Sequence, residues 1–224
     1  LQPWLRKAVN ASPLLRDALD GTWLGTPLHP ALTDVPIGAA SAALALDSAE
    51  VAFDDPAFGL AADGALAVGV LASLPAAVTG ASDTRDLWGE LRRIAVIHAI
   101  LNAGALALNT YSVFLRANGR RGAGKAASAV GFLATTVAAH LGGELSFGHG
   151  VRVNQTVWHD GPTEFTEVLD EAELGDMNVR RVEVHGAPVL LARSRQGDVC
   201  AIAATCNHAG GPLDQGERRG DEII

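Results

Sequence analysis

The residues with the clearest chemical potential stand near the end of the 224-residue chain, in the segment Cys206-Asn207-His208-Ala209-Gly210-Gly211. We call residues 206–211 the Cys–His loop. A thiol and an imidazole two positions apart on an extended loop can approach neighbouring atoms of one metal cofactor, and the glycines let the backbone come close and aim N–H groups at sulfur. A structural zinc site is the competing interpretation, but it requires four ligands and usually pairs cysteines at C-x₂₋₄-C spacing.

Three short β-type runs precede this loop, at 179–184, 188–193 and 199–204, and turn-forming residues separate them. They predict an all-β module that holds the loop after its third strand. Upstream, the acidic segment 164–176 is expected to form a first strand followed by a short surface turn. The second cysteine, Cys200, lies in the third strand and is predicted to be a small core residue.

The order C-x-H-x-G-x-x-L in this β context resembles the Rieske [2Fe-2S] family over about residues 165–224. In that family one box of this form and a second C-x-x-H box each supply a Cys and a His, so that two thiolates hold one iron and two imidazoles the other. The resemblance implies that Cys206 binds the all-thiolate iron and His208 the imidazole iron. Gly211 stands where respiratory-complex members carry a disulfide-forming cysteine, so the chain looks more like the ferredoxin and oxygenase branch.

The sequence departs from the family pattern in two places. Asn207 stands between the ligands where the family commonly has Pro or Thr, a tolerable change because that side chain need not touch iron. The second Cys/His pair is absent from residues 1–224, and Cys200 is not expected to replace it. We therefore expect these residues to be part of a longer protein, with a C-x-x-H box soon after Ile224 and a [2Fe-2S] cluster that needs it.

Residues 1–150 have a different character. The chain is 48% hydrophobic, with a mean hydropathy of +0.19, and four apolar stretches at 34–51, 59–80, 94–115 and 126–145 approach the ~20 residues that cross a bilayer. The alternative is a soluble four-helix bundle, since Asp47, Asp63 and Glu144 interrupt the stretches. We predict a multidomain protein, with an all-α four-helix transmembrane bundle at 1–150 followed by the incomplete all-β Rieske-like domain at 151–224.

The segment Gly25-Thr26-Pro27-Leu28-His29-Pro30 and its continuation to Gly38, together with residues 79–83 and 98–102, resemble a bacterial four-helix membrane domain of undefined function. Some members of that family are fused to an iron–sulfur domain. The predicted topology places both ends of the bundle and the connection 81–93 on one side, side A, and the other two connections on side B. Basic residues favour side A as cytoplasmic: side A carries Arg6, Lys7, Arg16, Arg85, Arg92, Arg93 and Arg152, and side B carries Arg116, Arg120, Arg121 and Lys125.

Polar residues of several stretches fall at one membrane depth near side A. His98 and His140 could face each other as ligands of a b-type haem or line a quinone pocket, with His29 and Asp34 nearby. Asn102 and Asn109 share a helix face with His98, and Glu144 lies one turn from His140. The alternative is interhelical hydrogen bonding that holds an Ala-rich bundle together.

These features predict a multi-pass bacterial membrane protein whose Rieske-type domain faces the cytoplasm and transfers single electrons to a redox partner protein or a quinone. The β module shows no substrate-activating site, so any catalysis would belong to a partner in an oxidoreductase system. The net charge of −8 and pI near 5.3 exclude a nucleic-acid-binding surface. The alternatives are the haem or quinone bundle, and a structural membrane protein whose β domain only mediates interaction.

Overall fold

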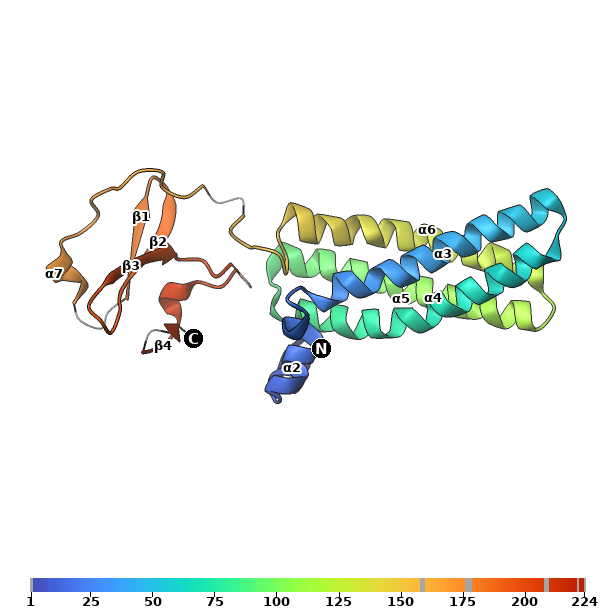
Figure 1. Cartoon of the computed structure of the whole chain (residues 1–224), viewed down its shortest axis with the longest axis horizontal. Coiled ribbons are helices and arrows are strands. Elements are labelled where there is room, and N and C mark those ends of the chain that lie inside the picture. Colours follow the sequence, from blue (N-terminus) through green and yellow to red (C-terminus); the bar gives the residue numbers. More distant parts are fainter. Residues whose placement is uncertain (1, 158–159, 176–178, 208–209, 221, 224) are drawn as a thin grey trace. The chain divides into compact units, whose positions relative to one another are not determined.

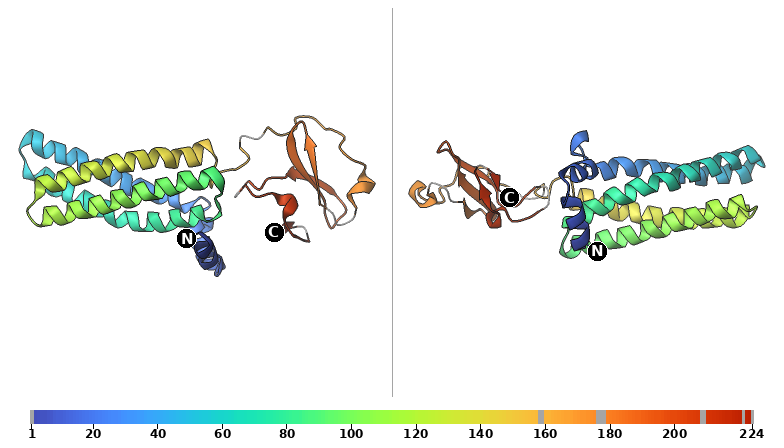
Figure 2. Two further views of the ribbon diagram at one scale, coloured as in Figure 1. Left: turned by 180° about the vertical axis from the view of Figure 1, so that it is seen from behind. Right: turned by 90° about the horizontal axis from the view of Figure 1, so that it is seen from below.

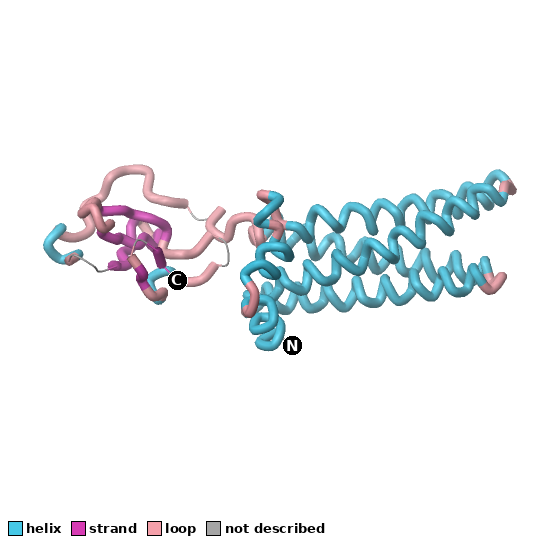
Figure 3. Tube along the Cα trace, turned by 60° about the horizontal axis from the view of Figure 1, so that its bottom comes forward, coloured by secondary structure: helices cyan, strands magenta, loops and turns pink. Residues whose placement is uncertain are grey.

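The computed structural model describes residues 2–157, 160–175, 179–207, 210–220 and 222–223. They form two compact units, Leu1–Leu145 and Ser146–Ile224, which are described separately below (Figure 1). Figure 3 shows helices through the first unit, and within the described residues strands occur only in the second.

Four long helices make up most of the first unit. Two short helices, α1 (Gln2–Asn10) and α2 (Pro13–Asp20), come before them, with a 3-10 turn at Thr22–Leu24. The long helices are α3 (Leu28–Phe53), α4 (Pro56–Asp83), α5 (Gly89–Ala117) and α6 (Arg121–Gly143); a 3-10 turn follows α4 at Thr84–Asp86, and a π-helical turn, Glu144–Gly148, continues α6. All four are long and apolar enough to cross a membrane. The four predicted spans are confirmed.

Local sequence explains the sharp connection on side B between α3 and α4. Asp54 ends α3 with a left-handed backbone conformation. Asp55 then caps α4, its Oδ1 accepting a hydrogen bond from the Ala57 N–H at 2.9 Å, and Pro56 occupies the first turn, where no intrahelical donor is needed. α3 begins at Leu28, earlier than expected, because a helix tolerates Pro30 in its first turn.

The helical unit has apolar side chains outside and small or polar ones inside. Leu60, Leu71 and Leu133 are 76%, 66% and 64% exposed, whereas Ser112 is fully buried and Ala43 almost so. A water-soluble bundle would hide its leucines and place polar residues on its surface. This distribution favours a surface in contact with lipid and disfavours the soluble bundle.

The four long helices form two equivalent hairpins, α3–α4 and α5–α6, visible as two layers in Figure 2. Asp47 and Arg116, both buried, are separated by 69 residues, and His29 and His98 have the same separation. Buried residues of α4 and α6 also correspond in pairs, and the two members of each pair are always separated by the same number of residues. These pairs are Ala62 and Gly124, Leu66 and Ser128, Gly69 and Gly131, and Ala76 and Ala138. The helical unit is therefore a tandem repeat of one hairpin, which was not predicted from the sequence.

The second unit contains an antiparallel sheet in the order β1-β2-β3, formed by β1 (Val179–Val184), β2 (Ala187–Arg193) and β3 (Val199–Ala203). Its register places Val182 opposite Val189 and Leu191 opposite Ala201. A 3-10 turn (Leu213–Gln215) follows, and then the small hairpin of β4 (Arg218–Arg219) and β5 (Glu222–Ile223). The expected all-β character is confirmed.

Two predictions for this unit are wrong. Residues 164–176 contain no strand in their described part; instead Glu171–Leu174 form the short helix α7, whose Leu174 is buried. Four good helix formers follow Asp170, and Gly175 ends the helix with a positive φ, which explains this turn. Cys200 is exposed rather than a core residue: β3 is one of the two outer strands of the sheet, and all five of its residues are exposed.

Candidate metal centre and polar interior

The Cys–His loop is closed at its base by main-chain hydrogen bonds. The Cys206 N–H donates to Gly211 O at 2.8 Å, and the Gly210 N–H donates to Cys206 O at 2.8 Å. Immediately below, Thr205 and Pro212 form a β-bridge that continues from β3. The sheet therefore ends in a tight loop that fixes the backbone of Cys206, whose side chain is half-buried.

Gly210 is required by its conformation and its neighbour. Its φ is +72°, where L-residues with a side chain are strained, and a Cβ there would lie 3.3 Å from Gln155 Oε1. The Gln155 N–H in turn donates to Asn207 O at 2.6 Å, so the segment around Gln155 supports the loop from outside.

An open, mainly apolar hollow of about 360 Å³ lies beside the Cys206 side chain. Its lining consists of Cys206, Gly211, Pro212, Leu213, Gln215, Gly216 and Ile223. A fixed, half-buried thiol with glycines and apolar neighbours suits a ligand of an iron–sulfur cluster, whose sulfurs need close backbone and limited water. The second predicted ligand, His208, lies outside the described residues, and in the described part of the chain no three metal-ligating side chains form a group.

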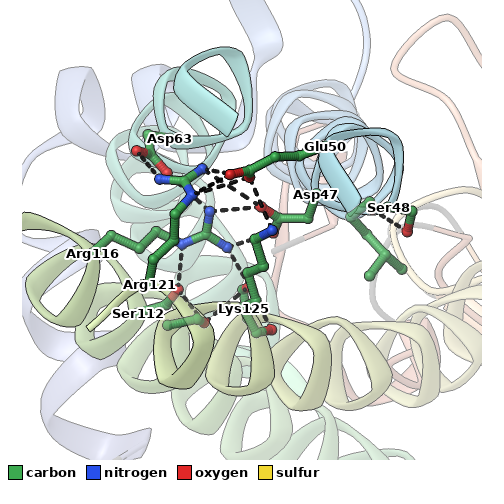
Figure 4. A network of polar contacts seen from close by, with 11 residues as sticks. Asp47, Ser48, Glu50, Asp63, Ser112, Arg116, Arg121 and Lys125 are labelled. Atoms are coloured by element: carbon green, nitrogen blue, oxygen red, sulfur yellow. Dashed lines mark hydrogen bonds and ion pairs between the residues drawn. The ribbon is translucent and has the colours of Figure 1, made fainter. Parts of the chain in front are cut away.

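A network of opposite charges fills the helical unit near side B (Figure 4). Arg116 Nη1 donates to Asp47 Oδ1 at 2.8 Å and to Asp63 Oδ1 at 2.9 Å, and its side chain is only 2% exposed. Arg121 Nη1 donates to Asp63 Oδ2 at 2.7 Å and its Nε to Glu50 Oε1 at 2.9 Å. Lys125 lies 2.9 Å from Glu50 Oε2. Three cations thus neutralise three carboxylates from four helices.

Two serines complete the coordination of Arg116. Ser112 Oγ accepts from Arg116 Nε at 3.1 Å, and Ser128 Oγ accepts from Nη2 at 2.9 Å. Such satisfaction is necessary because an unpaired charge in a lipid-surrounded interior costs several kcal/mol. In the sequence the acidic residues look like interruptions of the apolar spans, and the basic residues look like charges of a connecting loop. Asp47 and Glu50 lie one helical turn apart, as do Arg121 and Lys125, and this spacing could have indicated that each pair faces the interior of the bundle.

The imidazoles near side A have a different arrangement from the one predicted. The rings of His29 and His98 are neighbours, with centroids 6.3 Å apart and planes at 89°. His140 and Glu144 are exposed on the outside of the unit. The expected pairing of His98 with His140 is wrong because Ala138 and Gly142 form the inner face of α6, and a residue midway between them points the other way. Asp34 is also exposed. Asn102 lies on the same helix face as His98, as expected, and its Nδ2 lies 3.1 Å from His98 Nε2.

A second ion pair fastens the short N-terminal helices to the bundle. Arg85, 3% exposed, donates from Nη1 to Asp20 Oδ1 at 2.6 Å and from Nη2 to Asp20 Oδ2 at 2.5 Å. This bidentate pair joins the end of α2 to the connection between α4 and α5, and Ser82 Oγ accepts from the same guanidinium at 2.7 Å.

Fold and site together define a membrane-spanning four-helix protein that carries a Rieske-type iron–sulfur domain. The family model described as "Predicted membrane protein (DUF2231)" matches residues 25–155, and that of the Rieske [2Fe-2S] domain matches residues 164–224. The chain belongs to the DUF2231 membrane protein family, fused to a Rieske domain as the sequence predicted. No curated protein and no solved structure matches the chain.

Proposed function

We propose that this protein is a membrane-anchored electron carrier in which Cys206 and His208 each bind one iron of a [2Fe-2S] cluster. The observation that carries the proposal is the fixed, half-buried Cys206 thiol beside an apolar hollow, within the stretch that matches the Rieske model. A second Cys/His pair would be needed to complete the ligand set.

The cluster supplies one-electron chemistry when it is bound. The chain's own contribution is to hold ligands and control their surroundings. Two main-chain hydrogen bonds fix the backbone of Cys206, and the left-handed Gly210 turns the chain back beside it. Pro212, Leu213 and Ile223 give the hollow an apolar wall, which restricts water and so influences the reduction potential.

The partner is proposed to be a redox protein or a quinone, since the β unit belongs to the same chain as the membrane-spanning helices. The described β unit offers a ligand loop and an exposed edge strand but no arrangement of acid, base and nucleophile around a substrate cavity. The protein is therefore proposed to relay electrons within an oxidoreductase system rather than to catalyse a reaction itself.

The β unit is proposed to face the cytoplasm of a bacterial cell. It follows α6 on side A, where Lys7, Arg92 and Arg93 are exposed. On side B, Arg116, Arg121 and Lys125 are neutralised inside the ion network, so they contribute little to the positive-inside bias. Within the described residues no ion pair is found for these three cations of side A, and on side B the same holds for Arg120 alone; this difference supports the proposed orientation.

Topology is testable through Cys200, which is exposed on β3. A membrane-impermeant maleimide should label Cys200, identified by peptide mass spectrometry, in inverted membrane vesicles but not in intact spheroplasts. Labelling in spheroplasts alone would place the β unit on the opposite side of the membrane.

Iron content tests the ligand assignment. The full-length protein purified from iron-replete cells should contain about two iron and two acid-labile sulfide per chain. Cys206→Ser should remove most of both, while Cys200→Ser should retain them because that thiol lies on an exposed edge strand. Equal loss in both variants, or an iron-free parent protein, would contradict the proposal.

A further inference from the structure

We propose that His29 and His98 are the two axial ligands of an iron tetrapyrrole, a b-type haem, bound inside the helical unit near side A. The site and the Cys–His loop lie in different units, so the haem proposal does not depend on the proposed iron–sulfur cluster. It also replaces the His98–His140 pair, which the outward position of His140 rules out.

The internal repeat places these two residues at equivalent positions. His29 and His98 share the 69-residue spacing of Asp47 and Arg116, and in both pairs a residue contacts its own equivalent. In a two-fold arrangement, such contacts occur only on the symmetry axis. The two imidazoles therefore come from different hairpins, an arrangement that allows them to bind one metal ion from opposite sides.

Hydrogen bonding orients both rings in the same way. His29 Nδ1 lies 2.9 Å from Ala76 O, and His98 Nδ1 lies 2.8 Å from Ala138 O. A carbonyl oxygen can only accept, so each Nδ1 carries the proton and each Nε2 keeps a lone pair. Metal-binding histidines typically use this carbonyl bond to fix the coordinating nitrogen.

Small residues make space for the rings at equivalent places. A Cβ on Gly80 of α4 would lie 2.7 Å from the His29 ring, and one on Gly142 of α6 would lie 3.0 Å from the His98 ring. Each glycine stands one turn after the alanine whose carbonyl accepts from Nδ1. In each hairpin the carbonyl acceptor and the glycine together accommodate one imidazole ring, and both hairpins contain this arrangement.

The ring separation fits coordination from opposite sides of one ion. A metal–nitrogen distance of about 2.1 Å, with the ring centre about 1.2 Å beyond the nitrogen, gives about 6.6 Å between two opposed ring centres. The ring centres of His29 and His98 are 6.3 Å apart. Bare zinc would need two more protein ligands, and no group of three metal-ligating side chains occurs in the described residues. A tetrapyrrole supplies four equatorial nitrogens itself, so two histidines suffice.

Two neighbouring features bear on the choice of ligand. Asn102 Nδ2 lies 3.1 Å from His98 Nε2 and also donates to His98 O at 3.0 Å, so it can release the nitrogen and keep a hydrogen bond. A quinone would require hydrogen-bond donors for its carbonyl oxygens, whereas the two Nε2 atoms offer lone pairs. The arrangement is therefore better suited to coordinating iron than to holding a quinone.

Hemin titration into the detergent-solubilised full chain tests the site. We use a Cys206→Ser background, which removes cluster absorption, and expect one hemin per chain with the low-spin spectrum of two imidazole ligands. His29→Ala and His98→Ala should each weaken hemin binding at least ten-fold and abolish the low-spin spectrum. Exogenous imidazole should restore that spectrum, which a misfolded variant would not allow.

The matched control is His140→Ala, a histidine on the outer face of α6, which should bind hemin like the parent. Each of the following results would overturn the proposal: no low-spin hemin complex with the parent chain, unchanged binding by His29→Ala or His98→Ala, or loss of binding by His140→Ala. Binding of a quinone analogue at His29 and His98 in place of hemin would also overturn it.

Discussion

The two units of this protein differ in the kinds of side chain that they bury and expose. The helical unit encloses Asp47 and Arg116 and exposes leucines, whereas the β unit encloses Leu174 and Leu190 and exposes charged side chains of β1. Lipid offers no hydrogen bonds, so polar groups in the first unit must satisfy one another. Water can solvate the charged side chains of the second unit, which carries the Cys–His loop with its proposed metal ligand. The difference can be sharpened by substitutions matched between the units.

The largest expected effect is loss of the charge balance in the helical unit. Arg116→Met leaves the Asp47 and Asp63 carboxylates without their shared partner, and breaking a buried pair in this way costs about 3–5 kcal/mol. Thermal unfolding of the detergent-solubilised protein should show a large loss of stability. Ser48→Ala is the control, since Ser48 is exposed and its Oγ donates to Leu44 O within its own helix (Figure 4). Equal stability of the two variants would show that the network does not hold the helices together.

In the β unit, removal of apolar volume should have the next largest effect. Leu190 is fully buried, so Leu190→Ala should destabilise this unit by about 2–4 kcal/mol through lost transfer energy and a residual cavity. Ile202→Ala, at a position 47% exposed in the neighbouring strand, should cost much less. Chemical denaturation followed by circular dichroism measures both; similar losses would mean that the second face of β3 is covered.

A smaller effect is expected from adding a methyl group to the Cys–His loop. Gly210→Ala imposes a left-handed conformation on alanine and presses its Cβ toward Gln155, at a cost of about 1–2 kcal/mol. Gly211→Ala should be nearly neutral, because a Cβ added at that position would meet nothing within 4 Å. Iron retention during mild chelation should fall in the first variant only. Faster iron loss from Gly211→Ala would contradict this loop geometry.

The smallest effect concerns a surface ion pair of the β unit. Arg193 Nη1 lies 2.9 Å from Glu171 Oε1, but the Glu171 side chain is 74% exposed. Glu171→Gln should therefore cost less than about 1 kcal/mol. Denaturation midpoints of the parent and the variant should converge as salt is raised. A loss as large as that of Arg116→Met would erase the contrast between the units.

Much of the fold could be predicted from the sequence because it depends on local patterns. The apolar stretches predicted the spans, and the turn at His185 and Gly186 separated β1 from β2 as expected. Depth along a helix could also be predicted, which is why His29 and His98 were expected at one level. The inward-facing side of each helix was harder to predict, because it depends on the spacing of small residues. The spacing of Ala138 and Gly142 could have shown that His140 faces outward.

The rest depended on contacts between distant segments. Arg116 and Asp47 are 69 residues apart, and no local pattern pairs them. A comparison of the chain with itself would have aligned them, together with Gly69 and Gly131, and could have revealed the repeated hairpin. The Cys206 position within its loop was predicted from motif and strand order, but the support from Gln155 was not, because it comes from a segment without regular structure.

Electron paramagnetic resonance of the reduced, membrane-embedded full-length protein tests the central claim most directly. We predict the low-average-g spectrum of a [2Fe-2S] cluster with mixed thiolate and imidazole ligands, present in the parent and in Cys200→Ser and missing in Cys206→Ser. A reduced, iron-replete parent protein without that spectrum, or a spectrum that survives Cys206→Ser, would contradict it.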